Sequence, residues 1–132
     1  MKKYVLTICS VLLLSVMFMG GSASAGQITE VVTAKSSWQN TGNIVKEKTT
    51  SYGKCKNYTN YGKLNKTKIR VRAKIGGDYV TVLSAVSLPK DNVLYSMSYS
   101  NTVNAGKLIR FCYTLPDSSV SSDKCKITYN LY

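Results

Sequence analysis

Residues 66–75 alternate strictly between basic and apolar or small side chains, and this pattern restricts the fold more than any other feature of the sequence. The basic positions are Lys66, Lys68, Arg70, Arg72 and Lys74. Between them stand Thr67, Ile69, Val71, Ala73 and Ile75. Side chains two residues apart share one face of a β-strand, whereas a helix would spread both sets around its circumference. The segment is therefore predicted to be a strand with one face in a hydrophobic core and five cations on the other.

Short strand-like segments separated by turn residues recur through the rest of the chain. Before the basic segment, the pattern predicts a strand over 28–33 and an edge strand over 44–50, while 52–63 favours no element. After it, strands are predicted over 79–88, 93–100, 109–115 and 124–131. Turn residues lie at 76–78, 89–92 and 104–106. No segment has the pattern of a helix longer than one turn.

These segments predict an all-β fold. The five strands from residue 66 to the C-terminus follow one another closely and are expected to form a meander, with the earlier strands supplying a second layer. We therefore predict a small antiparallel β-sandwich of about seven strands built around this C-terminal meander. A small β-barrel is the alternative.

The first 25 residues have the three parts of a bacterial export signal. Lys2 and Lys3 precede a mainly apolar stretch over 5–19, and Ala23-Ser24-Ala25 fits a signal-peptidase site before Gly26. The apolar stretch is shorter than the roughly 18 residues that indicate a transmembrane helix. We therefore predict a signal peptide at 1–25 and a single secreted domain at 26–132.

The predicted mature chain is strongly basic. Because Lys2 and Lys3 leave with the signal peptide, its formal net charge is +10, compared with +12 for the whole sequence. This balance favours anionic cell-wall polymer or an anionic lipid surface as partner, and also nucleic acid, for which no motif is present. Further lysines would widen the basic strand if they lay beside it, namely Lys46, Lys48, Lys54, Lys56 and Lys63. Alternatively, the same cations only maintain solubility and prevent edge pairing.

Tyrosine is the most frequent aromatic residue, with ten copies against two of phenylalanine and one of tryptophan. Tyr52, Tyr58 and Tyr61 lie in a stretch rich in lysine and asparagine, where exposed rings would stack on sugars or bases. The tyrosines on predicted strands are expected in the core or at its rim. Trp38, in a polar segment, is interpreted as a packing anchor.

The predicted mature chain has an odd number of cysteines, Cys55, Cys112 and Cys125. Cys112 and Cys125 lie on successive predicted strands joined by a polar loop, so we predict a disulfide between them and a free thiol at Cys55. A bond from Cys55 to either of the others is the alternative. The spacing matches no metal motif and the sequence has no histidine, so we predict neither a metal site nor a cofactor.

Catalysis has little support in the sequence. Histidine is absent, and most of the six acidic residues lie in predicted turns or beside cations. The first hypothesis is a non-enzymatic secreted protein that binds anionic surfaces or polymers through the basic strand, with bacteriocin-like antibacterial action as its most specific form. The second is a structural or interaction module of the cell envelope or extracellular matrix. The third is a hydrolase with a carboxylate pair.

Overall fold

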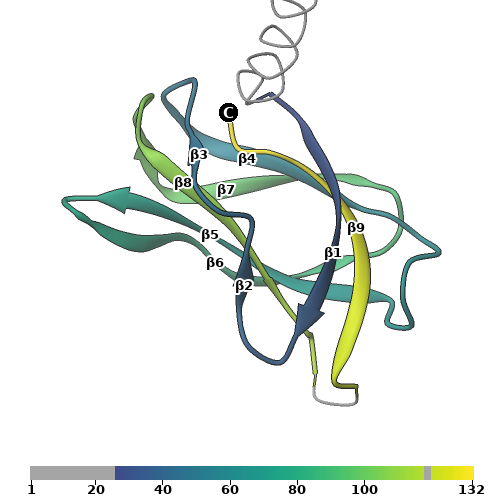
Figure 1. The fold of residues 1–132 in the computed structure, drawn as a ribbon. Coiled ribbons are helices and arrows are strands. Elements are labelled where there is room, and N and C mark those ends of the chain that lie inside the picture. The colour runs from purple at the N-terminus through teal and green to yellow at the C-terminus, as the bar shows by residue number, and fades with distance from the viewer. Residues whose placement is uncertain (1–25, 118–119) are drawn as a thin grey trace, which may run out of the picture.

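The computed structural model describes residues 26–117 and 120–132, so the predicted signal peptide lies outside the described residues. Two antiparallel sheets pack face to face (Figure 1). Sheet A contains, in spatial order, β1 (Ile28–Lys35), β9 (Ser122–Asn130), β4 (Thr50–Asn57) and β7 (Leu94–Val103). Sheet B contains β2 (Gln39–Asn40), β8 (Leu108–Thr114), β5 (Lys66–Ile75) and β6 (Asp78–Pro89), and the short β3 (Ile44–Val45) also pairs with β8.

This arrangement confirms the predicted all-β sandwich, and the two sheets do not close into a barrel. In the ranges that the structure describes, no helix is long and apolar enough to cross a bilayer.

The predicted C-terminal meander is wrong. β5 and β6 form a hairpin within sheet B, but each later connection, from β6 to β7, β8 and β9, crosses to the other sheet. Counting β2 and β3 as one interrupted strand, eight strands divide equally between the sheets in the order of a jelly roll. Alternation predicts which residues of a strand face the core, but it does not say which sheet the strand joins, because both sheets contact the same core.

The core lies between the sheets and follows the predicted alternation in β5. The buried residues of this strand are Thr67, Ile69, Val71 and Ala73. Across the core, the rings of Phe111 on β8 and Tyr129 on β9 stack with centroids 4.7 Å apart. Ile75 differs from the prediction, because it is exposed near the tip of the β5–β6 hairpin, which projects beyond the sandwich (Figure 1).

Strand β4 lies mostly where the sequence favours no element, whereas the predicted edge strand over 44–50 is reduced to the two residues of β3. The inward positions of β4 include Gly53 and Asn57, which an apolar pattern does not reveal. Gly53 is required by packing, since a Cβ at this position would collide with the Tyr99 hydroxyl. Small and polar core residues therefore concealed the strand.

A buried ion pair joins three distant parts of the chain. The Lys90 Nζ lies 2.6 Å from Asp123 Oδ2, and the two side chains are 4% and 2% exposed. Lys90 also donates hydrogen bonds to the backbone oxygens of Tyr61 and Lys124, while Asp123 accepts two from backbone amides of the 58–65 loop. The pair therefore holds this loop between the end of β6 and the start of β9.

The cysteines of the described residues are free and buried, so the predicted Cys112–Cys125 disulfide is absent. Cys112 lies opposite Arg70 on the outer side of sheet B, whereas Cys125 faces the core from sheet A. Their strands are consecutive in sequence but belong to different sheets, which separates the two thiols. Cys55 also faces the core from sheet A, where it pairs with Tyr129 of β9. Because Tyr129 is four residues from Cys125 on that strand, Cys55 and Cys125 are about 13 Å apart. Burial raises the pKa of the Cys55 thiol to about 12.

Candidate anion-binding face

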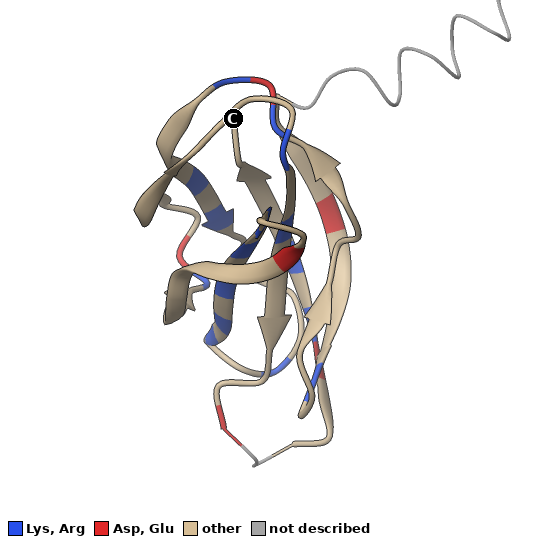
Figure 2. Cartoon of the chain, turned by 90° about the vertical axis from the view of Figure 1, so that its left-hand side faces the viewer, with Lys and Arg blue, Asp and Glu red and all other residues tan. Residues whose placement is uncertain are grey.

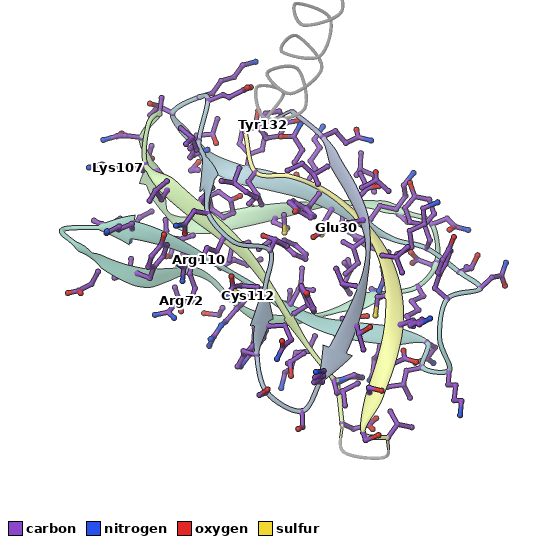
Figure 3. All side chains as sticks on the ribbon, viewed as in Figure 1. Glu30, Arg72, Lys107, Arg110, Cys112 and Tyr132 are labelled. Carbon is purple, nitrogen blue, oxygen red and sulfur yellow. The ribbon has the colours of Figure 1, made fainter. Side chains whose placement is uncertain are left out.

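Strand β5 places its five cations on the outer side of sheet B, opposite its buried residues. Over eight residue steps, this row is about 26 Å long. Arg110 of the neighbouring strand β8 extends it, because Arg72 and Arg110 are direct cross-strand partners (Figure 3). We call this surface the arginine face, made of Lys66, Lys68, Arg70, Arg72, Lys74 and Arg110. It contains all three arginines of the sequence.

Trp38 packs on the arginine face. The guanidinium carbon of Arg70 lies 4.2 Å from the centroid of the Trp38 ring, a distance typical of cation–π stacking. Trp38 thus has a packing role, and its partner is a charged surface group. A stacked guanidinium keeps its plane fixed, and this favours recognition of an oxyanion through two parallel hydrogen bonds.

Tyr79 and Asn43 hold the other two arginines. The guanidinium carbon of Arg110 lies 3.7 Å from the Tyr79 ring centroid, and its Nε donates a hydrogen bond to Asn43 Oδ1 at 2.7 Å. The Tyr79 hydroxyl donates to the same oxygen. Arg72 donates a hydrogen bond to the Tyr79 backbone oxygen at 2.6 Å. Neutral groups from two separate segments, at Asn43 and Tyr79, thus fix two like-charged side chains beside each other.

The arginine face retains its positive charge. The ion pair that the structure records among its described residues, Lys90–Asp123, lies outside this face. Burial raises the pKa of the Cys112 thiol, and the neighbouring arginines only partly oppose this effect, so the thiol is neutral at neutral pH. Like charges on directly opposite residues, here Arg72 and Arg110, destabilise a sheet. Solubility of the strand alone gives no reason for this cost, whereas a bound anion would offset it.

The arginines also have unused hydrogen-bond donors. The Nε atoms of Arg70 and Arg72 are buried and find no acceptor in the described parts of the chain. A buried donor without an acceptor costs free energy. An oxyanion bound between the arginines would supply the missing negative charge, and a shift of the two side chains would let it accept from these Nε atoms.

The tyrosines predicted to stack on ligands do not join the arginine face. Tyr52 lies on β4 of sheet A, with its ring 5.2 Å from that of Tyr132. Tyr58 and Tyr61 follow β4, beside Lys126 of β9, also in sheet A. The structure therefore separates the two predicted sets: the stacking residues lie on or beside sheet A, and the anion-binding residues lie on sheet B.

The lysines upstream of the basic strand do not widen it either. Lys54 and Lys56 lie on the outer side of sheet A, and Lys48 and Lys63 are exposed in loops. Lys46 is buried, and its Nζ donates hydrogen bonds to the backbone oxygens of residues 131 and 132. Burial lowers the pKa of Lys46 to about 8. These lysines therefore do not widen the basic strand, because the chain places them on different surfaces.

Basic residues recur as bands on several strands, while acidic residues are few and separate (Figure 2). In addition to these charged surfaces, an apolar groove of about 310 Å³ opens between the edge strands β6 and β7. Leu83, Val86 and Met97 are among its lining residues.

Comparisons with known proteins inform on the fold alone. No protein-family model matches the sequence, and no curated protein is similar to it. The crystal structure of tripeptidyl peptidase 2 contains a similar region, with a TM-score of 0.53 and 10% identity over 78% of this chain. The chain spans about 9% of that protein's length. The N-terminal cellulose-binding domain of Cellulomonas fimi β-1,4-glucanase C aligns with a TM-score of 0.40 and 17% identity, covering 80% of this chain and 75% of that domain.

Proposed function

We propose that the mature protein is secreted and binds an extended anionic polymer, bearing phosphate or carboxylate groups, through the arginine face. The observation that carries this proposal is the convergence of Arg70, Arg72 and Arg110, fixed by neutral partners and lacking a carboxylate partner among the described residues. Binding of this kind requires no catalytic group. Antibacterial action through a cell-wall polymer is its most specific form.

The shape of the arginine face favours a polymer over a lipid bilayer. A polymer chain can follow a row of cations of about 26 Å, with one anionic group at each cation. Membrane binding is strengthened by apolar side chains that enter the bilayer beside the cations. In the described chain, the large exposed apolar residues nearest this face are Val45, which pairs with Leu108 two residues from Arg110, and Ile75 and Val80 at the hairpin tip. None of them is a cross-strand partner of Lys68, Arg70 or Arg72.

Trp38 offers a direct measurement of this binding. It is the one tryptophan of the sequence and stacks on Arg70, so an anion at Arg70 is expected to change its fluorescence. We expect long-chain polyphosphate to saturate this signal. If all six cations of the face each neutralise one phosphate, the logarithm of the binding constant falls with the logarithm of salt concentration with a slope of about −4.

The titration is repeated between about 50 and 200 mM salt. With a slope of about −4, the affinity for polyphosphate is expected to fall several hundredfold over this range. Binding that is independent of salt would contradict the proposal, as would a fluorescence signal unchanged by the polymer. Vesicles containing phosphatidylglycerol form a parallel titration. Tighter binding to these vesicles than to polyphosphate would assign the face to a lipid surface instead.

A role as an interaction module of the cell envelope or matrix is the second candidate. The apolar groove between β6 and β7 favours it, because both strands are sheet edges and Val86 in the groove is 43% exposed. Unpaired edges can receive a strand from a partner protein. Such binding would depend weakly on salt, so the polyphosphate titration distinguishes the two functions.

A further inference from the structure

A second basic surface lies on the opposite side of the sandwich. On β4 and β9, the residues on either side of each surface lysine point toward the core, so the lysines project outward from sheet A. We call this surface the lysine face, made of Lys54, Lys56, Lys124 and Lys126. In the register of the two strands, Lys54 lies opposite Asn130, so the four lysines extend over about 20 Å.

Tyr58 lies at the centre of the lysine face. The Nζ atoms of Lys56 and Lys126 lie 4.8 Å and 5.0 Å from the centroid of its ring. The Tyr58 hydroxyl forms a hydrogen bond with Thr128 Oγ1 at 3.0 Å, and this oxygen lies 2.6 Å from Thr29 Oγ1. The hydrogen bond with Thr128 lowers the pKa of Tyr58, and the two lysines act in the same direction. One anchored ring thus brings two like charges together.

The acidic residues of β1 and β9 do not neutralise the lysine face. Asp123 is buried in its pair with Lys90, and Glu30 accepts a hydrogen bond from Tyr129, a core residue. Around the lysines on the outer side of sheet A, Ser96 and Asn130 bear hydroxyl and amide groups, and Thr128 is buried. The exposed apolar residues Val31 and Leu94 lie directly opposite Lys126 and Lys56. This surface therefore offers cations and hydrogen-bond donors to an anion.

The two basic faces point in opposite directions, because each is the outer side of one sheet and the sheets pack about 10 Å apart. A straight stretch of polymer that follows one face cannot follow the other. We propose that the protein is bivalent: the lysine face is a second site for polymeric anions, and one molecule cross-links two chains of the polymer. This inference rests on the proposed function of the arginine face.

The test compares two variants of the mature protein with the parent. In the first variant Lys54, Lys56 and Lys126 are replaced with Gln, and in the second Lys68, Arg70 and Arg72. A linear polyphosphate no longer than one face is titrated while stoichiometry is measured by native mass spectrometry. We expect two bound oligomers for the parent protein and one for each variant. One oligomer on the parent protein and on the lysine-face variant would overturn bivalency while leaving the proposed function intact. No bound oligomer on any protein would refute the proposed function itself.

Long-chain polyphosphate tests the cross-linking. Light scattering should show large clusters with the parent protein at low salt, and binding without clusters with either variant. The matched control replaces Lys35, Lys48 and Lys63 with Gln, which removes the same charge but keeps every lysine and arginine that defines the two faces, and should cluster like the parent. Clusters that persist in the lysine-face variant would contradict the inference. Self-association of the polymer-free parent protein in sedimentation velocity would also overturn the inference of bivalency, because an oligomer with one binding face per subunit could cross-link the polymer.

Discussion

Replacing Lys68, Arg70 and Arg72 with glutamine is expected to weaken binding of polyphosphate to the arginine face about a hundredfold. Each cation held at an anionic surface contributes on the order of 1 kcal/mol, and about 1.4 kcal/mol corresponds to a factor of ten. The three positions are adjacent on the outer side of β5, so one stretch of polymer contacts them together. Isothermal titration calorimetry at low salt measures the loss, because the Trp38 signal depends on Arg70 itself.

Protein stability should change by less than about 1 kcal/mol in this variant. Removing Arg72 relieves its repulsion with Arg110, while the stacking of Arg70 on Trp38 is lost, and the two effects are similar in size. The control variant with Gln at 35, 48 and 63 has the same net charge and should lose only a small part of the affinity. Equal losses in the two variants would mean that net charge alone determines binding. Unfolding of the β5 variant would show that the assignment of its two faces is wrong.

Replacing Lys90 with methionine is expected to lower the free energy of unfolding by about 3–5 kcal/mol, the usual cost of removing one partner of a buried ion pair. The carboxylate of Asp123 would remain buried without its cation, and the backbone oxygens of Tyr61 and Lys124 would lose their donor. Denaturant unfolding measures the loss. As a control, Lys63→Met changes an exposed lysine of the same loop and should cost little.

The same pair predicts how stability depends on pH. Burial alone would raise the pKa of Asp123, but Lys90 and two backbone amides outweigh burial and lower it. Since the folded pKa lies below that of the unfolded chain, about 3.9, this contribution is complete at neutral pH and is lost as the pH falls below about 4. In Lys90→Met the acid-induced loss should shrink. An unchanged loss between about pH 5 and pH 2 would contradict this role of the pair.

The sequence predicted the outer side of β5 correctly because strict alternation leaves one arrangement of a half-buried strand. It did not predict Arg110 as a neighbour of Arg72, because that contact depends on which strands share a sheet. The predicted Cys112–Cys125 disulfide failed for the same reason. The prediction assumed that consecutive strands form a hairpin, but β8 and β9 belong to different sheets. Trp38, Asn43 and Tyr79 come from separate segments, and no local pattern brings them to the arginines.

The lysine face shows the same limitation. Lys54 and Lys56 were visible as part of a basic stretch, but β4 itself was not, because Gly53 and Asn57 occupy inward positions. Without the strand, the direction of its lysines was undetermined. The sequence therefore predicted the charge of the protein and the class of its fold, while the division of that charge between two faces required the order of the strands.

The central claim, that the arginines form an anion site, can be tested most directly by nuclear magnetic resonance of the arginine Nε–Hε groups. The sequence has three arginines, so the spectrum of the folded protein should show three such signals, all from this face. On titration with pyrophosphate at constant ionic strength, we expect the signals of Arg70 and Arg72 to shift most, because their Nε atoms lack acceptors, and that of Arg110 to shift less, because it already binds Asn43. If all three signals stay in place while pyrophosphate shifts resonances elsewhere, the arginine face is not the binding site.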